Sequence, residues 1–233
     1  MRGKVALIVH QKLSTPGRIG RELRRMGYTT DVRRVCLGDP LPEFDGEHVG
    51  AVIFGGPMNV HDEEEFPFLR LEKRWIAGAL YSGLPFLGVC LGGQMLADVL
   101  GAPVELHPGG LHEIGYHPIR GTSAGKPLFD SELAVYQWHS YGFGLPAGAV
   151  RLATSEAFEN QAFRYGDRAY AIQFHPEVTA KTVDRWTDGG AAKLGWRGAQ
   201  SKAEQLRLTP RHQPRIRAWL RGFLPHWLDA PTL

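Results

Sequence analysis

Short apolar runs that alternate with helical patterns constrain the fold of the first hundred residues more than any other feature. Val5–Val9 is a continuous apolar run of the kind found in strands buried on both faces, and Val49–Phe54 and Pro85–Val89 are further strand-like runs. A further strand-like run covers Thr29–Val35. Helical patterns separate these runs: one opens at Thr15-Pro16 and another lies within Phe66–Tyr81. This alternation predicts a three-layer α/β/α architecture, in which helices cover both faces of a mostly parallel sheet.

The pattern changes after Pro103, where strand-like segments follow one another with little helix between them. We interpret these segments as mixed or antiparallel strands added to the parallel core. The predicted strands here are Val104–His107, Ile114–Ile119, Leu133–Trp138, Val150–Ala153, Gln161–Arg164 and Tyr170–Phe174. Helices are predicted within Thr179–Trp186 and Arg211–Phe223. The 233 residues fit a single domain, residues 1–233, with a basic helical extension over about residues 190–233.

The composition argues against several classes of protein. A net charge of +3 gives no reason to expect binding to nucleic acid or to a membrane surface. No stretch approaches the ~20 apolar residues that cross a bilayer. Two cysteines, Cys36 and Cys90, provide no disulfide framework, so we expect a reduced, cytoplasmic environment.

Cys90 stands at a junction between a strand and a helix. It follows Pro85–Val89 and precedes apolar residues at helical spacing. Gly88 and Gly92 flank it and remove side chains where the two arms of a sharp turn would collide. Such a turn presents a nucleophile at its apex, and the N-terminus of the following helix favours a thiolate. The alternative is a structural cysteine buried at this junction.

A second motif ends the strand-like run Tyr170–Phe174 with His175-Pro176-Glu177. Residues two apart in an extended segment point to the same side, and Pro176 restricts His175 to extended conformations. Glu177 is therefore expected to hold one tautomer of His175. The other ring nitrogen is then free to take a proton from a thiol.

A third motif, Gly55-Gly56-Pro57, ends the run Val49–Phe54. Parallel strands end at the same edge of a sheet, where the active sites of such folds gather. The turn leaves backbone N–H groups unobstructed, and one of them, together with that of Leu91, can donate to an oxygen that becomes an anion. A plain tight turn is the alternative.

These three motifs together resemble those of class I, or triad, glutamine amidotransferases, a family with a flavodoxin-like fold. The resemblance extends from the first strand to the helix after Glu177. Gly56-Pro57-Met58-Asn59-Val60 and Glu113-Ile114-Gly115-Tyr116 are similar to stand-alone members that resemble the amidotransferase half of GMP synthetase.

The resemblance implies a division of roles and no cofactor or metal. Cys90 would attack the side-chain amide of glutamine and form a γ-glutamyl thioester. His175 would protonate the departing ammonia and then activate water, while Glu177 orients and polarises His175. The backbone N–H groups of Gly56 and Leu91 would form the oxyanion hole.

The resemblance also implies residues that bind the substrate. Gln94 matches a family position that contacts glutamine, although a core or surface glutamine is the alternative. The segment Gln137–Phe143 matches the loop that receives the amino-acid end of the substrate, which implies roles for Ser140, Tyr141 and Phe143. Many stand-alone relatives carry an aspartate where Tyr141 stands, so this chain lacks a carboxylate that would suit an α-ammonium group.

Two functions therefore stay open. The first is hydrolysis of glutamine to supply ammonia to a synthetase on another polypeptide, and the second is hydrolysis of γ-glutamyl peptides or amides without ammonia transfer. A non-catalytic module on the same fold is disfavoured by the intact Cys90, His175 and Glu177. An α/β-hydrolase is disfavoured because its acid precedes its histidine in the chain.

Other features are assigned structural roles. Cys36 is expected to pack beside a strand end, and His139 to be structural because His175 already fills the role of the base. The run Asp62–Glu65 after His61 is interpreted as a solvated helix start rather than a metal site. The basic C-terminal helix either docks a partner or is an ordinary surface helix.

Overall fold

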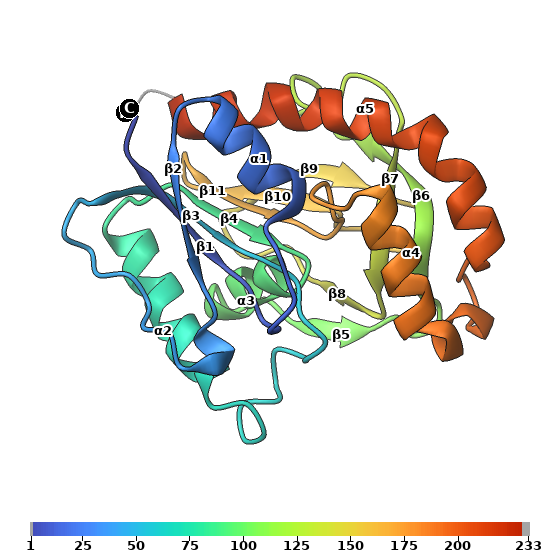
Figure 1. Ribbon diagram of the computed structural model, residues 1–233, viewed down its shortest axis with the longest axis horizontal. Coiled ribbons are helices and arrows are strands. Elements are labelled where there is room, and N and C mark those ends of the chain that lie inside the picture. The colour runs from blue at the N-terminus through green and yellow to red at the C-terminus, as the bar shows by residue number, and fades with distance from the viewer. Residues whose placement is uncertain (1, 230–233) are drawn as a thin grey trace.

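A nine-stranded mixed sheet forms the centre of the protein (Figure 1). The structure, a computed structural model, describes residues 2–229. The strand order is β2-β1-β3-β4-β11-β10-β9-β6-β7, and β5 and β8 form a separate two-stranded sheet. The strands are β1 (Lys4–Ile8), β2 (Thr29–Arg33), β3 (His48–Ile53), β4 (Phe86–Val89), β5 (Val104–Leu106), β6 (Glu113–Gly121), β7 (Leu133–His139), β8 (Tyr141–Phe143), β9 (Val150–Thr154), β10 (Ala162–Tyr165) and β11 (Ala169–Ile172).

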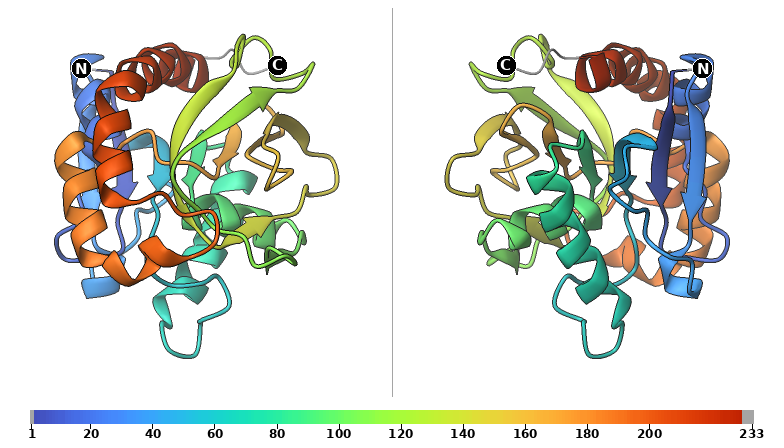
Figure 2. Two further views of the ribbon diagram at one scale, coloured as in Figure 1. Left: turned by 90° about the vertical axis from the view of Figure 1, so that its right-hand side faces the viewer. Right: turned by 90° about the vertical axis from the view of Figure 1, so that its left-hand side faces the viewer.

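Helices cover both faces of this sheet, as the views in Figures 1 and 2 show. The helices are α1 (Gly17–Arg25), α2 (Phe68–Tyr81), α3 (Leu91–Val99), α4 (Ala180–Gly189) and α5 (Lys202–Asp229). On one face, α1 and α5 bury apolar side chains such as Leu23 and Leu220 in one core cluster. On the other face, α2 and α3 bury Ile76 and Met95 in a second cluster. The predicted three-layer α/β/α fold is confirmed.

The strand order brings three carboxyl ends together at one edge of the sheet. Strand β4 lies between β3 and β11 and is parallel to both, with Ile53 opposite Gly88 and Ile172 opposite Val89. The chain leaves these strands towards Gly55, Cys90 and His175. Segments that are distant in the chain therefore meet, because parallel strands in register end together.

The antiparallel additions follow the sequence prediction with local differences. Strands β9, β10 and β11 pair antiparallel, as do β6 and β7. The short strand β8 was not predicted, because it has only three residues and is defined by its pairing with β5. The predicted strand Thr29–Val35 ends at Arg33, and Val35–Leu37 forms a 3₁₀ turn.

Helix α5 is much longer than the predicted Arg211–Phe223. It runs over 28 residues and contains Pro210, Pro214 and Pro225. Tertiary packing sustains the helix through these prolines, since Leu220 and Trp227 are fully buried against the sheet. Its arginines Arg217 and Arg221 ion-pair with Glu22 of α1 at 3.5 and 3.1 Å.

Within residues 2–229, none of the helices combines the length and the apolar character required to cross a membrane.

Candidate active site

Cys90 occupies a strained turn between β4 and α3. Its φ of 52° and ψ of −109° make it the only non-glycine residue with a positive φ in the described part of the chain. Its backbone N–H donates to the carbonyl of Ile172 at 2.8 Å, and its own carbonyl accepts from the N–H of Gln94. A side chain at Gly88 would collide with the backbone of Gly92 across the turn. The side chain of Cys90 is 6% exposed.

His175 and Glu177 form a buried pair beyond the end of β11. The Nδ1 atom of His175 lies 2.8 Å from Oε1 of Glu177. The strand predicted to run to Phe174 is too long, because β11 ends at Ile172. Beyond the end of this strand, the backbone N–H of His175 donates to the carbonyl of Tyr136 at 2.8 Å. Burial alone would lower the pKa of His175, but the Glu177 carboxylate and the Cys90 side chain outweigh it and raise this pKa to about 10.

Gly55 adjoins the side chains of both Cys90 and His175. A Cβ atom at this position would come within 2.7 Å of Cε1 of His175 and 3.4 Å of Cβ of Cys90. The structure thus brings Cys90, His175 and Glu177 together, with a glycine where any side chain would crowd the first two. Sequence reasoning considered the Gly55-Gly56 turn only for its N–H groups and missed this steric requirement.

Gly56 and Leu91 also lie next to each other. A Cβ atom at Gly56 would be 3.0 Å from Cδ2 of Leu91 and 2.9 Å from Cβ of His10. Leu91 is the first residue of α3, so its N–H is one of the groups that have no partner within the helix. The two predicted oxyanion donors therefore belong to neighbouring backbone segments at the edge where Cys90 stands.

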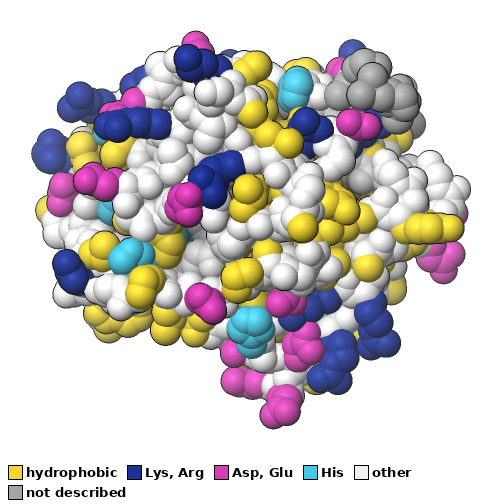
Figure 3. All heavy atoms as spheres, turned by 180° about the vertical axis from the view of Figure 1, so that it is seen from behind, with side chains coloured by type: hydrophobic (Ala, Val, Ile, Leu, Met, Phe, Trp, Pro, Cys, Tyr) yellow, Lys and Arg dark blue, Asp and Glu magenta, His cyan; other side chains and the backbone are white. Residues whose placement is uncertain are grey.

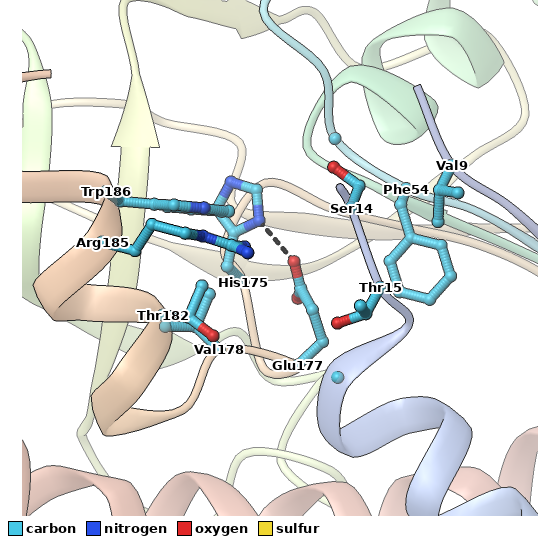
Figure 4. Close-up of a pocket in the computed structure, with 12 residues that line it drawn as sticks. Val9, Ser14, Thr15, Phe54, His175, Glu177, Val178, Thr182, Arg185 and Trp186 are labelled. Carbon is cyan, nitrogen blue, oxygen red and sulfur yellow. Dashed lines mark hydrogen bonds and ion pairs between the residues drawn. The ribbon is translucent and has the colours of Figure 1, made fainter. Parts of the chain in front are cut away.

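A pocket opens on the His175 side of this group (Figure 4). The ring of Trp186 stands edge-on to the imidazole at 5.0 Å between centroids, and Ser14, Thr15 and Arg185 also line the pocket. None of these residues was singled out from the sequence. Thr15-Pro16 was used only as a helix start and Trp186 only as the end of a helix, so no chemical signal pointed to them.

Two side chains of a buried polar network contact the backbone carbonyl of Tyr141. This carbonyl accepts from Nε2 of Gln94 at 3.0 Å and lies 2.9 Å from Nδ1 of His139. The Nε2 atom of His139 lies 2.9 Å from Glu113. Gln94 is 5% exposed and its amide is also 3.3 Å from Oε1 of Gln173. Gln94 and Tyr141, predicted to bind substrate, are thus joined directly.

The other two predicted substrate residues lie differently. The ring of Phe143 is buried and packs edge-on against Phe163 at 5.2 Å, so any substrate contact would come from its backbone. The hydroxyl of Ser140 lies 2.7 Å from Nδ1 of His112 and is part-buried.

Within residues 2–229, one group of side chains comes close enough to share a cation. Asp45, Glu47 and His48 have potential ligand atoms within 4.8 Å of one another, but Asp45 and Glu47 are exposed and His48 pairs with Asp31 at 3.0 Å. His61 is not part of this group. The acidic run after His61 lies in the loop between β3 and α2, on the lobe at the bottom of Figure 3, where acidic and basic side chains gather.

Comparison with known proteins defines the class. Residues 12–186 match the family described as glutamine amidotransferase class-I. The chain belongs to the class I glutamine amidotransferase family, as the sequence motifs predicted, and this membership implies hydrolysis of glutamine to ammonia for an acceptor.

Individual relatives agree with this membership. A solved glutamine amidotransferase from Thermotoga maritima is 34% identical with a TM-score of 0.90, covering 99% of this chain and 100% of that one. The glutamine amidotransferase-like protein YfeJ of Salmonella typhimurium is 35% identical over 189 residues, 78% of each chain. A GMP synthase of Acinetobacter baylyi is 34% identical over 144 residues, which are 56% of this chain but 23% of that enzyme.

Proposed function

We propose that Cys90, His175 and Glu177 hydrolyse the side-chain amide of glutamine through a γ-glutamyl thioester. One observation carries this proposal: a buried cysteine in a strained turn lies beside a histidine that is hydrogen-bonded to a glutamate, and Gly55 adjoins both the cysteine and the histidine. A structural cysteine needs neither a positive φ nor a histidine–carboxylate pair.

The chemistry follows from the protonation of the pair. A His175 with a pKa of about 10 holds its proton at neutral pH, so an imidazolium stands beside the sulfur of Cys90. The sulfur attacks the amide carbon, and the N–H groups of Gly56 and Leu91 donate to the resulting oxyanion, each worth about 3 kcal/mol of barrier. His175 then gives its proton to the departing ammonia. In the second half it takes a proton from water, whose oxygen displaces the thiolate and releases glutamate.

We further propose that the ammonia passes to an acceptor enzyme on another polypeptide. The relatives named GMP synthase support transfer of ammonia to an acceptor, and the segments that match this chain span 23% to 36% of their length.

A second candidate substrate is a γ-glutamyl peptide or amide. The side chain of Tyr141 packs against the core cluster on the α2 and α3 face and offers no carboxylate. Selection of the free α-ammonium group of glutamine would then depend on backbone carbonyls, and the carbonyl of Tyr141 is already engaged by Gln94. The thioester chemistry is the same for both substrates.

The test measures ammonia and glutamate released from glutamine beside a panel of γ-glutamyl peptides and amides. Turnover of glutamine supports the first function, while turnover of a γ-glutamyl peptide with inert glutamine supports the second. Cys90→Ala should abolish either activity, whereas Cys36→Ser, which changes the other free cysteine, should not. Undiminished turnover by Cys90→Ala would refute the mechanism for both substrates.

A further inference from the structure

Another buried histidine–glutamate pair lies beneath the Gly55-Gly56 turn. His10, just after β1, and Glu72, on α2, have fully buried side chains, and Nε2 of His10 lies 2.8 Å from Oε2 of Glu72. The Nδ1 atom of His10 lies 3.2 Å from the carbonyl oxygen of Gly55. The ring of His10 also stacks on Phe68 at 6.0 Å.

Both contacts are hydrogen bonds when Glu72 is ionised and both ring nitrogens of His10 donate. A backbone carbonyl and a carboxylate are acceptors only, so the ring that satisfies both carries two protons. Burial lowers the pKa of His10, but the Glu72 carboxylate and the carbonyls of Gly55 and Phe54 outweigh burial and raise it. The pair therefore behaves as an imidazolium clamped between α2 and the turn.

The carbonyl that His10 holds belongs to the peptide unit that joins Gly55 to Gly56. In a trans peptide the C=O and the N–H point in opposite directions. Holding the Gly55 oxygen towards His10 therefore directs the Gly56 N–H away from His10. Two consecutive glycines are the most flexible backbone available, so without an external contact this peptide could rotate.

We propose that His10, held by Glu72, is a positioning residue that orients the Gly56 N–H for the oxyanion formed during amide hydrolysis. The inference rests on the proposed function, because it concerns the same reaction. His10 touches neither the substrate nor Cys90; it acts through the Gly55-Gly56 peptide. Sequence analysis gave His10 and Glu72 no role, since 62 residues separate them.

Two double variants that differ only in the donor to Gly55 test this role. His10→Asn/Glu72→Gln keeps an N–H donor at the position of Nδ1, whereas His10→Leu/Glu72→Gln removes it; both remove the buried carboxylate that would otherwise be left unpaired. We expect His10→Leu/Glu72→Gln to lower kcat about tenfold to a hundredfold with little change in KM. We expect His10→Asn/Glu72→Gln to stay within about threefold of the wild type, since it keeps the donor.

Two controls separate positioning from general stability. Alkylation of Cys90 by iodoacetamide forms no oxyanion, so its rate should be equal in the two double variants. His48→Leu/Asp31→Asn removes another histidine–carboxylate pair, at the opposite end of β3, and should leave kcat unchanged. If His10→Leu/Glu72→Gln does not fold, His10→Phe/Glu72→Leu replaces it, because it retains the volume of a ring.

The outcomes are distinct. A wild-type protein inert towards glutamine and towards the whole γ-glutamyl panel overturns the proposed function, and this inference with it. An active wild type whose two His10 double variants have equal kcat overturns the inference alone. A loss of kcat matched by an equal loss of alkylation rate also overturns it, because disruption of the whole site would then explain both.

Discussion

A methyl group at Gly55 would test directly whether contact between Cys90 and His175 governs activity. The Cβ atom of Gly55→Ala would lie 2.7 Å from Cε1 of His175, whereas carbon atoms in contact are ordinarily about 3.5 to 4.0 Å apart. The imidazole must therefore retreat by about 1 Å. Gly55 does not have a positive φ, so alanine causes no backbone strain and the change acts through displacement alone.

The expected cost follows from this displacement. A misplacement of about 1 Å at reacting groups costs about a hundredfold in rate, or about 3 kcal/mol of barrier. Crowding in the core adds a loss of about 1 to 3 kcal/mol in unfolding free energy. Gly55→Ala should therefore fold but turn over its substrate about a hundred times more slowly than the wild type.

The assay couples ammonia release to the oxidation of NADH by glutamate dehydrogenase, with urea unfolding measured on the same preparations. Gly222→Ala is the matched control, because it introduces the same methyl group on α5 where no atom lies within 4 Å. It should keep full activity and gain about 1 kcal/mol of stability. Wild-type turnover by Gly55→Ala would refute the argument that activity depends on close contact between the thiol and the imidazole.

Two further predictions concern the residues around this centre. Gln94→Leu leaves the Tyr141 carbonyl without one of its donors, so we expect KM to rise more than kcat falls. Steady-state kinetics measure both constants, and an unchanged KM would contradict a substrate role for Gln94. The raised pKa of His175 stabilises the fold fully below about pH 6.5, and this contribution is lost as the pH rises through about 10. The difference in unfolding free energy between the wild type and His175→Gln should therefore shrink by up to about 3 kcal/mol from pH 7 to pH 10. A pH-independent difference in urea titrations would contradict the shift.

Much of the fold was predictable because its signals are local. The apolar run Val5–Val9 and the Pro16 helix start each define an element through neighbouring residues, and both elements are present as β1 and α1. Helix α5 was not fully predicted, since Pro210 and Pro214 weaken the local helical pattern and only packing on the sheet compensates. The separate strand β8 likewise depends on a partner distant in the chain.

The sequence by itself determined the candidate groups: a glycine-flanked Cys90, the His175-Pro176-Glu177 motif and a Gly-Gly turn, each encoded within a few adjacent residues. The tertiary structure decided how they meet. It placed β4 between β3 and β11, brought Gly55 against both Cys90 and His175, and set the His10–Glu72 pair against the carbonyl of Gly55. These relations depend on strand order and on packing between distant segments. Neither can be predicted from a local pattern of residues.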